Sequence, residues 1–320
     1  MLPLYTFMFP LYFATFSCLE AIAQNGSLPE SFMDVNAEPQ LIFCQNNLEV
    51  DQQGGHLQGV QILEKNNDVY AVISGSSGIS AYYSVVQLGT PSRVSSVNVL
   101  MHKPFKHAGG IQIFQGFMVV GIEDNDLRDK SKVCIYKIDD PDNPPLKPLA
   151  VIERTGEPLR STAGCCAMNR IKDKYLVIVG DWDTRHLDFY TCQENKLLQH
   201  PVAFERVYAM DTEQLDRSGW TDKAWHAYQN INLLCDHEGK LYLFGFGQNA
   251  YQQNIADLFL LDHKELNEFS LTKLVSKTFQ CKAGADFRFG AGIFLQPGGK
   301  LKVVSCGQHI RESLVLNIHD

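Results

Sequence analysis

The sequence predicts an all-β protein with the architecture of a five-bladed β-propeller, built from four-stranded antiparallel blades. Two observations predict this fold class: a self-similar unit recurs along the chain, and each unit is made of short β-prone segments. A third is that no long amphipathic helical stretch competes, apart from a short helix expected within residues 211–223. The units begin at Gly55, Lys106, Thr162, Trp225 and Asp286.

Every unit has the same order of elements. A turn led by a small residue or a histidine opens a short apolar strand, such as residues 59–63 or 110–114. The second strand is strongly β-prone and ends near glycine, as in VYAVISG, FMVVG, YLVIVG, LYLFG and LKVVSCG. A polar loop then leads to a third strand, and the first four units add a more polar fourth, such as SSVNVLM or LAVIER.

The fifth unit ends after three strands, and one unassigned strand, QLIFCQ at residues 40–45, precedes the first unit. We expect this N-terminal strand to become the outer strand of the last blade, because closing the ring removes exposed sheet edges. The predicted domain organisation is therefore a single propeller over residues 39–320, preceded by a flexible mature N-terminus over residues 24–38.

Residues 1–23 are predicted to be a signal peptide. Residues 2–18 carry no charge, and Ala21-Ile22-Ala23 matches a small-x-small cleavage signal. We therefore expect a secreted or periplasmic protein, with no membrane span in the mature chain.

Two stretches carry a resemblance to a known family. They are VCIYKIDDPDNPPLKPLAVI, which begins at Val133, and YLVIVGDWD, which begins at Tyr175. Together they resemble the secreted LVIVD-type β-propeller repeats, over about two of the five units. The resemblance implies a propeller of surface or extracytoplasmic proteins and transfers no catalytic residue.

Charge and cysteine content limit the partners. The formal net charge of −8 and the lack of a basic run argue against nucleic acid, so we expect a protein or carbohydrate ligand and a monomeric chain. None of the cysteines has the CxxC spacing of a zinc or redox motif. Most lie in apolar, β-like runs, where a thiol packs as a small hydrophobic group.

The first candidate site is a group of histidines on the axial face. His56, His107 and His226 occupy equivalent positions, shortly before the first strand of their units. Entry turns of successive blades meet near the axis, so three neutral imidazoles could bind a divalent metal there. Alternatively, each histidine fixes its own turn. No cofactor is expected, and a divalent metal is the alternative.

Further ligand-binding candidates follow the second strands and fill the longest insertion. Glu123, Asp181 and Arg185 belong to the densest polar groups of the chain, where solvated loop carboxylates are the competing interpretation. Trp220 and Trp225 could stack on a ligand or plug the propeller face.

These features favour an exported, non-enzymatic binding or scaffold protein with its ligand on the axial face. One alternative is a metal-dependent hydrolase or lyase that uses the axial histidines with Glu123 or Asp181 as acid or base. The other is a lectin-like carbohydrate binder that uses the aromatic insertion.

Overall fold

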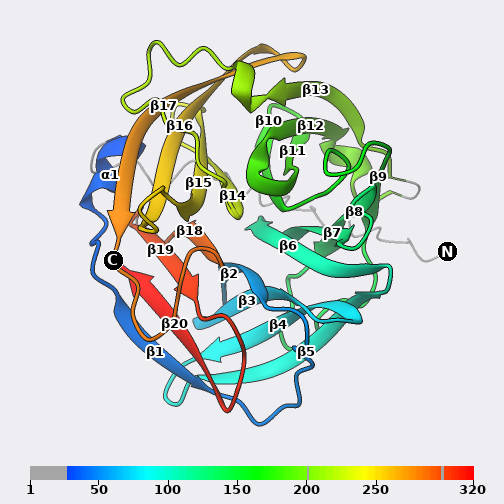
Figure 1. Cartoon of the computed structure of the whole chain (residues 1–320), viewed down its shortest axis with the longest axis vertical. Coiled ribbons are helices and arrows are strands. Elements are labelled where there is room, and N and C mark those ends of the chain that lie inside the picture. Colours follow the sequence, from blue (N-terminus) through cyan, green and yellow to red (C-terminus); the bar gives the residue numbers. More distant parts are fainter. Residues whose placement is uncertain (1–26, 200–201, 297–298) are drawn as a thin grey trace, which may run out of the picture.

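The structure is a computed structural model that describes residues 27–199, 202–296 and 299–320. Its strands form curled sheets arranged around a common centre (Figure 1). The predicted all-β, propeller-like fold class is therefore confirmed. The predicted signal peptide lies outside the described residues, and among those residues no helix is long and apolar enough to cross a membrane.

Antiparallel hydrogen bonding links the strands into successive groups of four. The first group is β2 (Leu57–Lys65), β3 (Asp68–Ser76), β4 (Ser80–Leu88) and β5 (Arg93–His102). The second group is β6 (Phe105–Phe114), β7 (Phe117–Asp124), β8 (Lys130–Lys137) and β9 (Ala150–Thr155). The third group is β10 (Cys165–Ile171), β11 (Lys174–Gly180), β12 (His186–Gln193) and β13 (Glu205–Asp211).

The last two groups complete the circle. The fourth group is β14 (Asn230–Cys235), β15 (Leu241–Gln248), β16 (Asn254–Glu265) and β17 (Glu268–Phe279). The fifth group is β18 (Ala291–Leu295), β19 (Leu301–Cys306), β20 (Ser313–His319) and β1 (Gln40–Gln45). Within the described residues, three short 3₁₀ turns lie between strands: η1 (Trp182–Thr184), η2 (Glu194–Lys196) and η3 (Thr212–Gln214). The last of these stands where a short helix was expected.

The hydrogen-bonded sheets differ from five separate blades. A single parallel pairing joins Gln45 of β1 to Arg93 of β5, and another joins Cys165 of β10 to Gly110 of β6. The described strands therefore form two eight-stranded sheets and one four-stranded sheet. The extra pairings arise where strands of neighbouring groups approach each other within hydrogen-bonding distance.

The hydrophobic core is divided among the contacts between neighbouring groups. One buried apolar cluster joins the first and second groups, and others join the second to the third and the third to the fourth. Two more join the fourth group to the fifth and the fifth back to the first. The core is thus a ring of interfaces around the axis, with the first strands β2, β6, β10, β14 and β18 innermost (Figure 1).

Glycine permits the close approach of the first strands at the axis. A Cβ atom added to Gly109 would lie 2.2 Å from the carbonyl oxygen of Gly164, and one added to Gly110 would lie 2.5 Å from that of Gln229. Both glycines lie within β6, at an irregularity in its pairing with β7, rather than in an entry turn. Any side chain there would push neighbouring strands apart.

Buried amide side chains tie the first strands together. They come from four successive first strands: Gln61, Gln112, Asn169 and Asn232. The Gln112 Oε1 accepts hydrogen bonds from the backbone N–H groups of Met168, at 3.0 Å, and Leu233, at 2.9 Å. Gln61 donates to Asn232 Oδ1 at 3.0 Å. These amides fill the centre of the ring below the entry turns.

The segment before β1 is folded onto the ring. Residues Leu28–Asp34 form α1, and the Ser27 backbone N–H donates to Glu30 Oε2 at 2.8 Å at its start. Phe32 is fully buried, with its ring 5.2 Å from that of Phe244. The described part of residues 24–38 therefore differs from the loose segment expected there, because its apolar face covers the cluster between the fourth and fifth groups.

Buried thiols pack as apolar groups, as predicted for at least half of the cysteines. Those that are both buried and free are Cys44, Cys134, Cys165, Cys166, Cys192 and Cys306. Burial raises the pKa of Cys44 to about 12, so this thiol stays protonated and inert at neutral pH.

Candidate functional site on the axial face

A cavity of about 280 Å³ opens where the entry turns meet at the axis. It is lined by residues of the first four groups: His56, Gln58, His107, Asn125, Gly164, Trp182, Asp183, Tyr228 and Gln229. The lining combines two imidazoles, several amides, one carboxylate and two aromatic rings. Such a small polar cavity with aromatic walls suits a hydrophilic ligand with a flat apolar face.

The repeated architecture explains why these residues converge. His56, Gly164 and Gln229 each lie directly before or close to the first strand of their group, and His107 lies within β6. Because the first strands are innermost, these segments reach one face at the axis. His56 and His107, which the repeat aligns with each other, both line the cavity. Their ring centroids are 6.2 Å apart.

His107 is held between a carboxylate and an amide. Its Nδ1 lies 3.0 Å from Oε1 of the fully buried Glu123, in a polar contact that is off the line of a hydrogen bond. Its Nε2 lies 2.8 Å from the side-chain nitrogen of Gln58. An amide N–H donates, so this contact assigns the lone pair to Nε2 and the proton to Nδ1 on the Glu123 side. The histidine is thus oriented by a buried acid, as in the base of a catalytic triad.

Glu123 also fixes the walls of the cavity. Its Oε1 accepts a 2.5 Å hydrogen bond from the Trp182 indole, and its Oε2 accepts one of 2.9 Å from the Ala163 backbone N–H. The guanidinium carbon of Arg128 lies 3.8 Å from the Trp182 ring centroid. The indole is therefore clamped in one orientation while it lines the cavity. Glu123 itself does not line the cavity.

Asp183, an exposed residue, lines the cavity from a strained segment. Asp183 and Thr184 have φ angles of 61° and 51°, in the left-handed region that non-glycine residues rarely adopt. Thr184 is fully buried, and its Oγ1 accepts a hydrogen bond from the Tyr228 backbone N–H at 3.3 Å. Strain of this kind persists only where the surroundings enforce it, and it concentrates at functional sites.

His56 is restrained by its own turn. Its Nδ1 lies 2.8 Å from the Leu57 carbonyl oxygen, and its ring packs edge-on against Phe289 with centroids 5.7 Å apart. Burial lowers the pKa of His56, so it is neutral at physiological pH. This geometry matches the alternative in which the histidine fixes the entry turn.

His226 lies outside the cavity, in a buried polar network of the fourth group. Its Nε2 is 3.9 Å from Asp257 Oδ2, an atom that also accepts a 2.5 Å hydrogen bond from Tyr228 and lies 2.6 Å from Nζ of Lys273. Among the described residues, no group of three or more His, Cys, Asp or Glu side chains could hold a metal ion. The three histidines proposed as metal ligands thus do not assemble into a metal site, because the turn before β14 directs His226 toward β16.

Two other polar candidates lie behind the cavity wall. Asp181 is buried. Its carboxylate accepts a hydrogen bond from the backbone N–H of His186 at 2.8 Å and lies 2.7 Å from Nδ1 of the same histidine. Burial raises the pKa of Asp181 above its ordinary value. The Arg185 Nε donates to the Trp182 carbonyl oxygen at 3.0 Å. Both hold the Asp183 turn in place and do not line the cavity.

The aromatic insertion forms part of the core, in agreement with the plug interpretation. Trp220 is buried and donates from its indole to the Leu271 carbonyl oxygen, at 3.0 Å. Trp225 donates to the Thr184 carbonyl oxygen at 3.2 Å and packs against Trp220 and Tyr228. Neither lines the axial cavity. The tryptophan that does is Trp182, which lies in the YLVIVGDWD stretch.

Comparison with known proteins gives fold neighbours only. No family model and no curated protein matches the chain. Among solved structures, it is similar to the catalytic domain of a GH62 α-L-arabinofuranosidase from Coprinopsis cinerea, with 10% identity, 87% of this chain and 97% of the other covered, and a TM-score of 0.50. It is also similar to an α-L-arabinofuranosidase from Podospora anserina solved with cellotriose, with 9% identity, 87% and 96% covered, and a TM-score of 0.50.

These neighbours correct the functional expectation. The sequence favoured a non-enzymatic binding or scaffold protein, whereas these solved structures of similar fold are glycoside hydrolases. The expectation of a non-enzymatic protein is wrong because a ring of blades can carry an active site as readily as a binding surface. The catalytic alternative was not favoured because it depended on histidines that bind a metal. At these identities the likeness concerns the fold alone.

Proposed function

We propose that the chain is an enzyme that hydrolyses a glycosidic bond of a carbohydrate bound in the axial cavity. The single observation that carries the proposal is the combination found there: the carboxylate-backed His107 and the strained Asp183 line the same cavity. The glycoside hydrolases of similar fold support the choice of substrate class, as does the cellotriose bound to one of them.

The cavity lining fits a sugar. Gln58, Asn125 and Gln229 offer amide donors and acceptors for hydroxyl groups, while the clamped Trp182 offers an aromatic face for the apolar side of a sugar ring. The cavity volume of about 280 Å³ is at the lower end of ligand pockets, which suits one sugar ring better than a long chain. We therefore infer cleavage of a terminal or branching sugar.

The proposed reaction needs two groups that exchange protons with the substrate. In our proposal, protonated His107, stabilised by Glu123, gives its proton to the oxygen of the leaving sugar as the glycosidic C–O bond breaks. A water oxygen bonds to the anomeric carbon, and its proton passes to the Asp183 carboxylate. The side chain of Gln58 must first release Nε2 of His107, which we expect the incoming sugar to bring about.

This arrangement departs from the usual pair of carboxylic acids that flank a glycosidic bond. The Asp183 carboxylate lines the cavity, whereas Glu123 lies behind the wall and acts through His107. We therefore place Glu123 as a positioning residue and His107 and Asp183 as the catalytic residues.

We also propose that the ring of five strand groups is a five-bladed propeller whose last blade is closed by β1. Antiparallel pairing runs through each group, β1 pairs with β20, and an apolar cluster joins every neighbouring pair of groups. The two parallel pairings between groups are then contacts between blades.

The test is release of sugar from a panel of arabinosyl, xylosyl and glucosyl oligosaccharides by the purified protein. We expect His107→Gln and Asp183→Asn each to lower kcat/KM by about 10²- to 10⁴-fold, the usual range for losing a general acid or base. The exposed His237→Gln and Asp68→Asn are matched controls and should retain full activity. Absence of turnover with every sugar, or full activity in both cavity variants, would overturn the proposal.

A further inference from the structure

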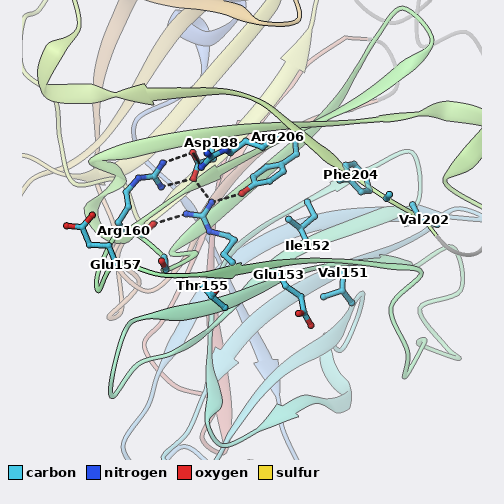
Figure 2. A pocket seen from close by; sticks show the side chains of 14 residues that line it. Val151, Ile152, Glu153, Thr155, Glu157, Arg160, Asp188, Val202, Phe204 and Arg206 are labelled. Carbon is cyan, nitrogen blue, oxygen red and sulfur yellow. Dashed lines mark hydrogen bonds and ion pairs between the residues drawn. The ribbon is translucent and has the colours of Figure 1, made fainter.

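A second, larger cavity of about 690 Å³ lies away from the axis, between the second and third groups (Figure 2). Its walls come from β9, from the connection at residues 156–161, and from β12 and the segment leading into β13. None of the residues that line it lines the axial cavity. It is therefore a separate place at which a ligand could bind.

Three arginines gather around one buried aspartate in this cavity. Arg154 Nη1 and Arg160 Nη1 donate to Asp188 Oδ2 at 2.5 and 2.6 Å, and Arg160 Nη2 donates to Oδ1 at 2.5 Å. Arg206 Nη1 lies 3.7 Å from Oδ1. Figure 2 shows Arg160 and Arg206 beside Asp188.

The three arginines outnumber the one carboxylate that contacts them, although Glu153 and Glu157 also line the cavity. Burial by itself would raise the pKa of Asp188. The hydrogen bonds and charges of Arg160 and Arg154 outweigh the effect of burial and hold this pKa below its ordinary value. One carboxylate thus faces three guanidinium groups. Glu153 does not compensate, because it is 68% exposed and pairs with Lys132 at 2.5 Å. Figure 2 shows its side chain directed away from the cluster, and Glu157 stands exposed beside Arg160.

Several guanidinium donors in the cluster have no acceptor. The Arg154 Nε is buried and has no hydrogen-bond partner among the described residues. For Arg206, the 3.7 Å contact with Asp188 is its one polar contact within the described part of the chain, and its side chain is 59% exposed. Arginine offers five N–H donors in a planar fork that matches an oxyanion. The cluster can therefore accept a second anion beside Asp188.

One side of the cavity is apolar. Val151, Ile152, Val202 and Phe204 form a wall next to the arginines (Figure 2). Phe204 and Val202 also pack on the cluster between the second and third groups, which fixes the wall in place. Charge at one end and an apolar wall at the other define an amphiphilic ligand.

We propose that this cavity binds a small molecule in which a phosphate or carboxylate oxyanion is joined to an aromatic or apolar body. The oxyanion occupies the free donors of Arg206 and Arg160, and the body lies along Phe204 and Val202. Such a ligand would bridge the second and third groups without entering the axial cavity.

Isothermal titration calorimetry with phenyl phosphate, phenylacetate and inorganic phosphate tests the proposal. We expect at least one aryl anion to bind about 10-fold or more tightly than inorganic phosphate, because only the aryl anions contact the apolar wall. Comparing the two aryl anions identifies the preferred head group. Binding should weaken as salt is added.

The variant Arg206→Gln should weaken the binding of that aryl anion about 10- to 100-fold, the effect of losing a charge-assisted hydrogen bond. Arg206 is exposed and contributes little to the buried pair, so the variant should fold. Arg170→Gln, which removes an arginine paired with Glu194 on the surface, is the matched control and should bind as the unmodified protein does. No binding of either aryl anion at about 10 mM, or equal binding by Arg206→Gln, would overturn the proposal.

Discussion

Gln112 offers the sharpest test of how the ring is held together at its axis. Its side chain is only 2% exposed and links three of the first strands. The Oε1 accepts from the backbone N–H groups of Met168 and Leu233, and the Nε2 donates to the Leu233 carbonyl oxygen at 2.9 Å. Replacing Gln112 by methionine keeps the length of the side chain and removes all three hydrogen bonds.

The expected loss in the free energy of unfolding depends on which hydrogen-bond partners of Gln112 the substitution leaves unsatisfied. The Leu233 carbonyl keeps a second donor, because Asn169 Nδ2 also bonds to it at 2.9 Å. The N–H groups of Met168 and Leu233 lose the side-chain acceptor and are shielded from water. Each unsatisfied buried donor costs about 1–3 kcal/mol, so Gln112→Met should lower the free energy of unfolding by about 2–6 kcal/mol. That is a large part of the stability of a typical protein.

Equilibrium urea unfolding measures this change. Gln45→Met is the matched control, because Gln45 is exposed at the end of β1, and it should change the free energy of unfolding by no more than about 0.5 kcal/mol. A loss of less than about 1 kcal/mol in Gln112→Met, or a loss equal to that of the control, would refute the account of the axis.

Two further predictions concern buried charge. Lys273→Met should lower the free energy of unfolding by about 3–5 kcal/mol, because it leaves the buried Asp257 unpaired, whereas the exposed Lys264→Met should have almost no effect in the same urea experiment. Burial lowers the pKa of His319 to about 4, so this histidine binds a proton at higher pH in the unfolded chain than in the folded one. The free energy of unfolding should therefore fall by about 3 kcal/mol from this group as the pH drops from about 6.5 to 4. Unfolding free energies measured across that range should depend less on pH in His319→Phe, and an unchanged slope would contradict the assignment.

Part of the site was predictable because it repeats along the chain. The equivalence of His56 and His107 follows from the register of the units, and both histidines do line the axial cavity. His226 has the same register, but the turn before β14 directs it to Asp257. The alignment of the repeated units predicts where a residue lies along the backbone, but it does not predict the direction of its side chain.

The roles of other residues could not be predicted from the sequence alone. Gln112 and the other buried amides come from four of the first strands, but a single amide in an apolar strand carries no signal until neighbouring strands are placed. The residue types around Asp183 favour a solvated loop carboxylate, because a positive φ cannot be read from them. Arg154 and Arg206 come from different units, and only the packing of the second group on the third brings them to Asp188.

The position of a bound oligosaccharide tests the central claim most directly. Crystals of the protein soaked with cellotriose or a comparable oligosaccharide should show a sugar ring against Trp182, with a glycosidic oxygen within hydrogen-bonding reach of His107 and the anomeric carbon facing Asp183. A sugar bound elsewhere on the ring, with the axial cavity empty, would contradict the account.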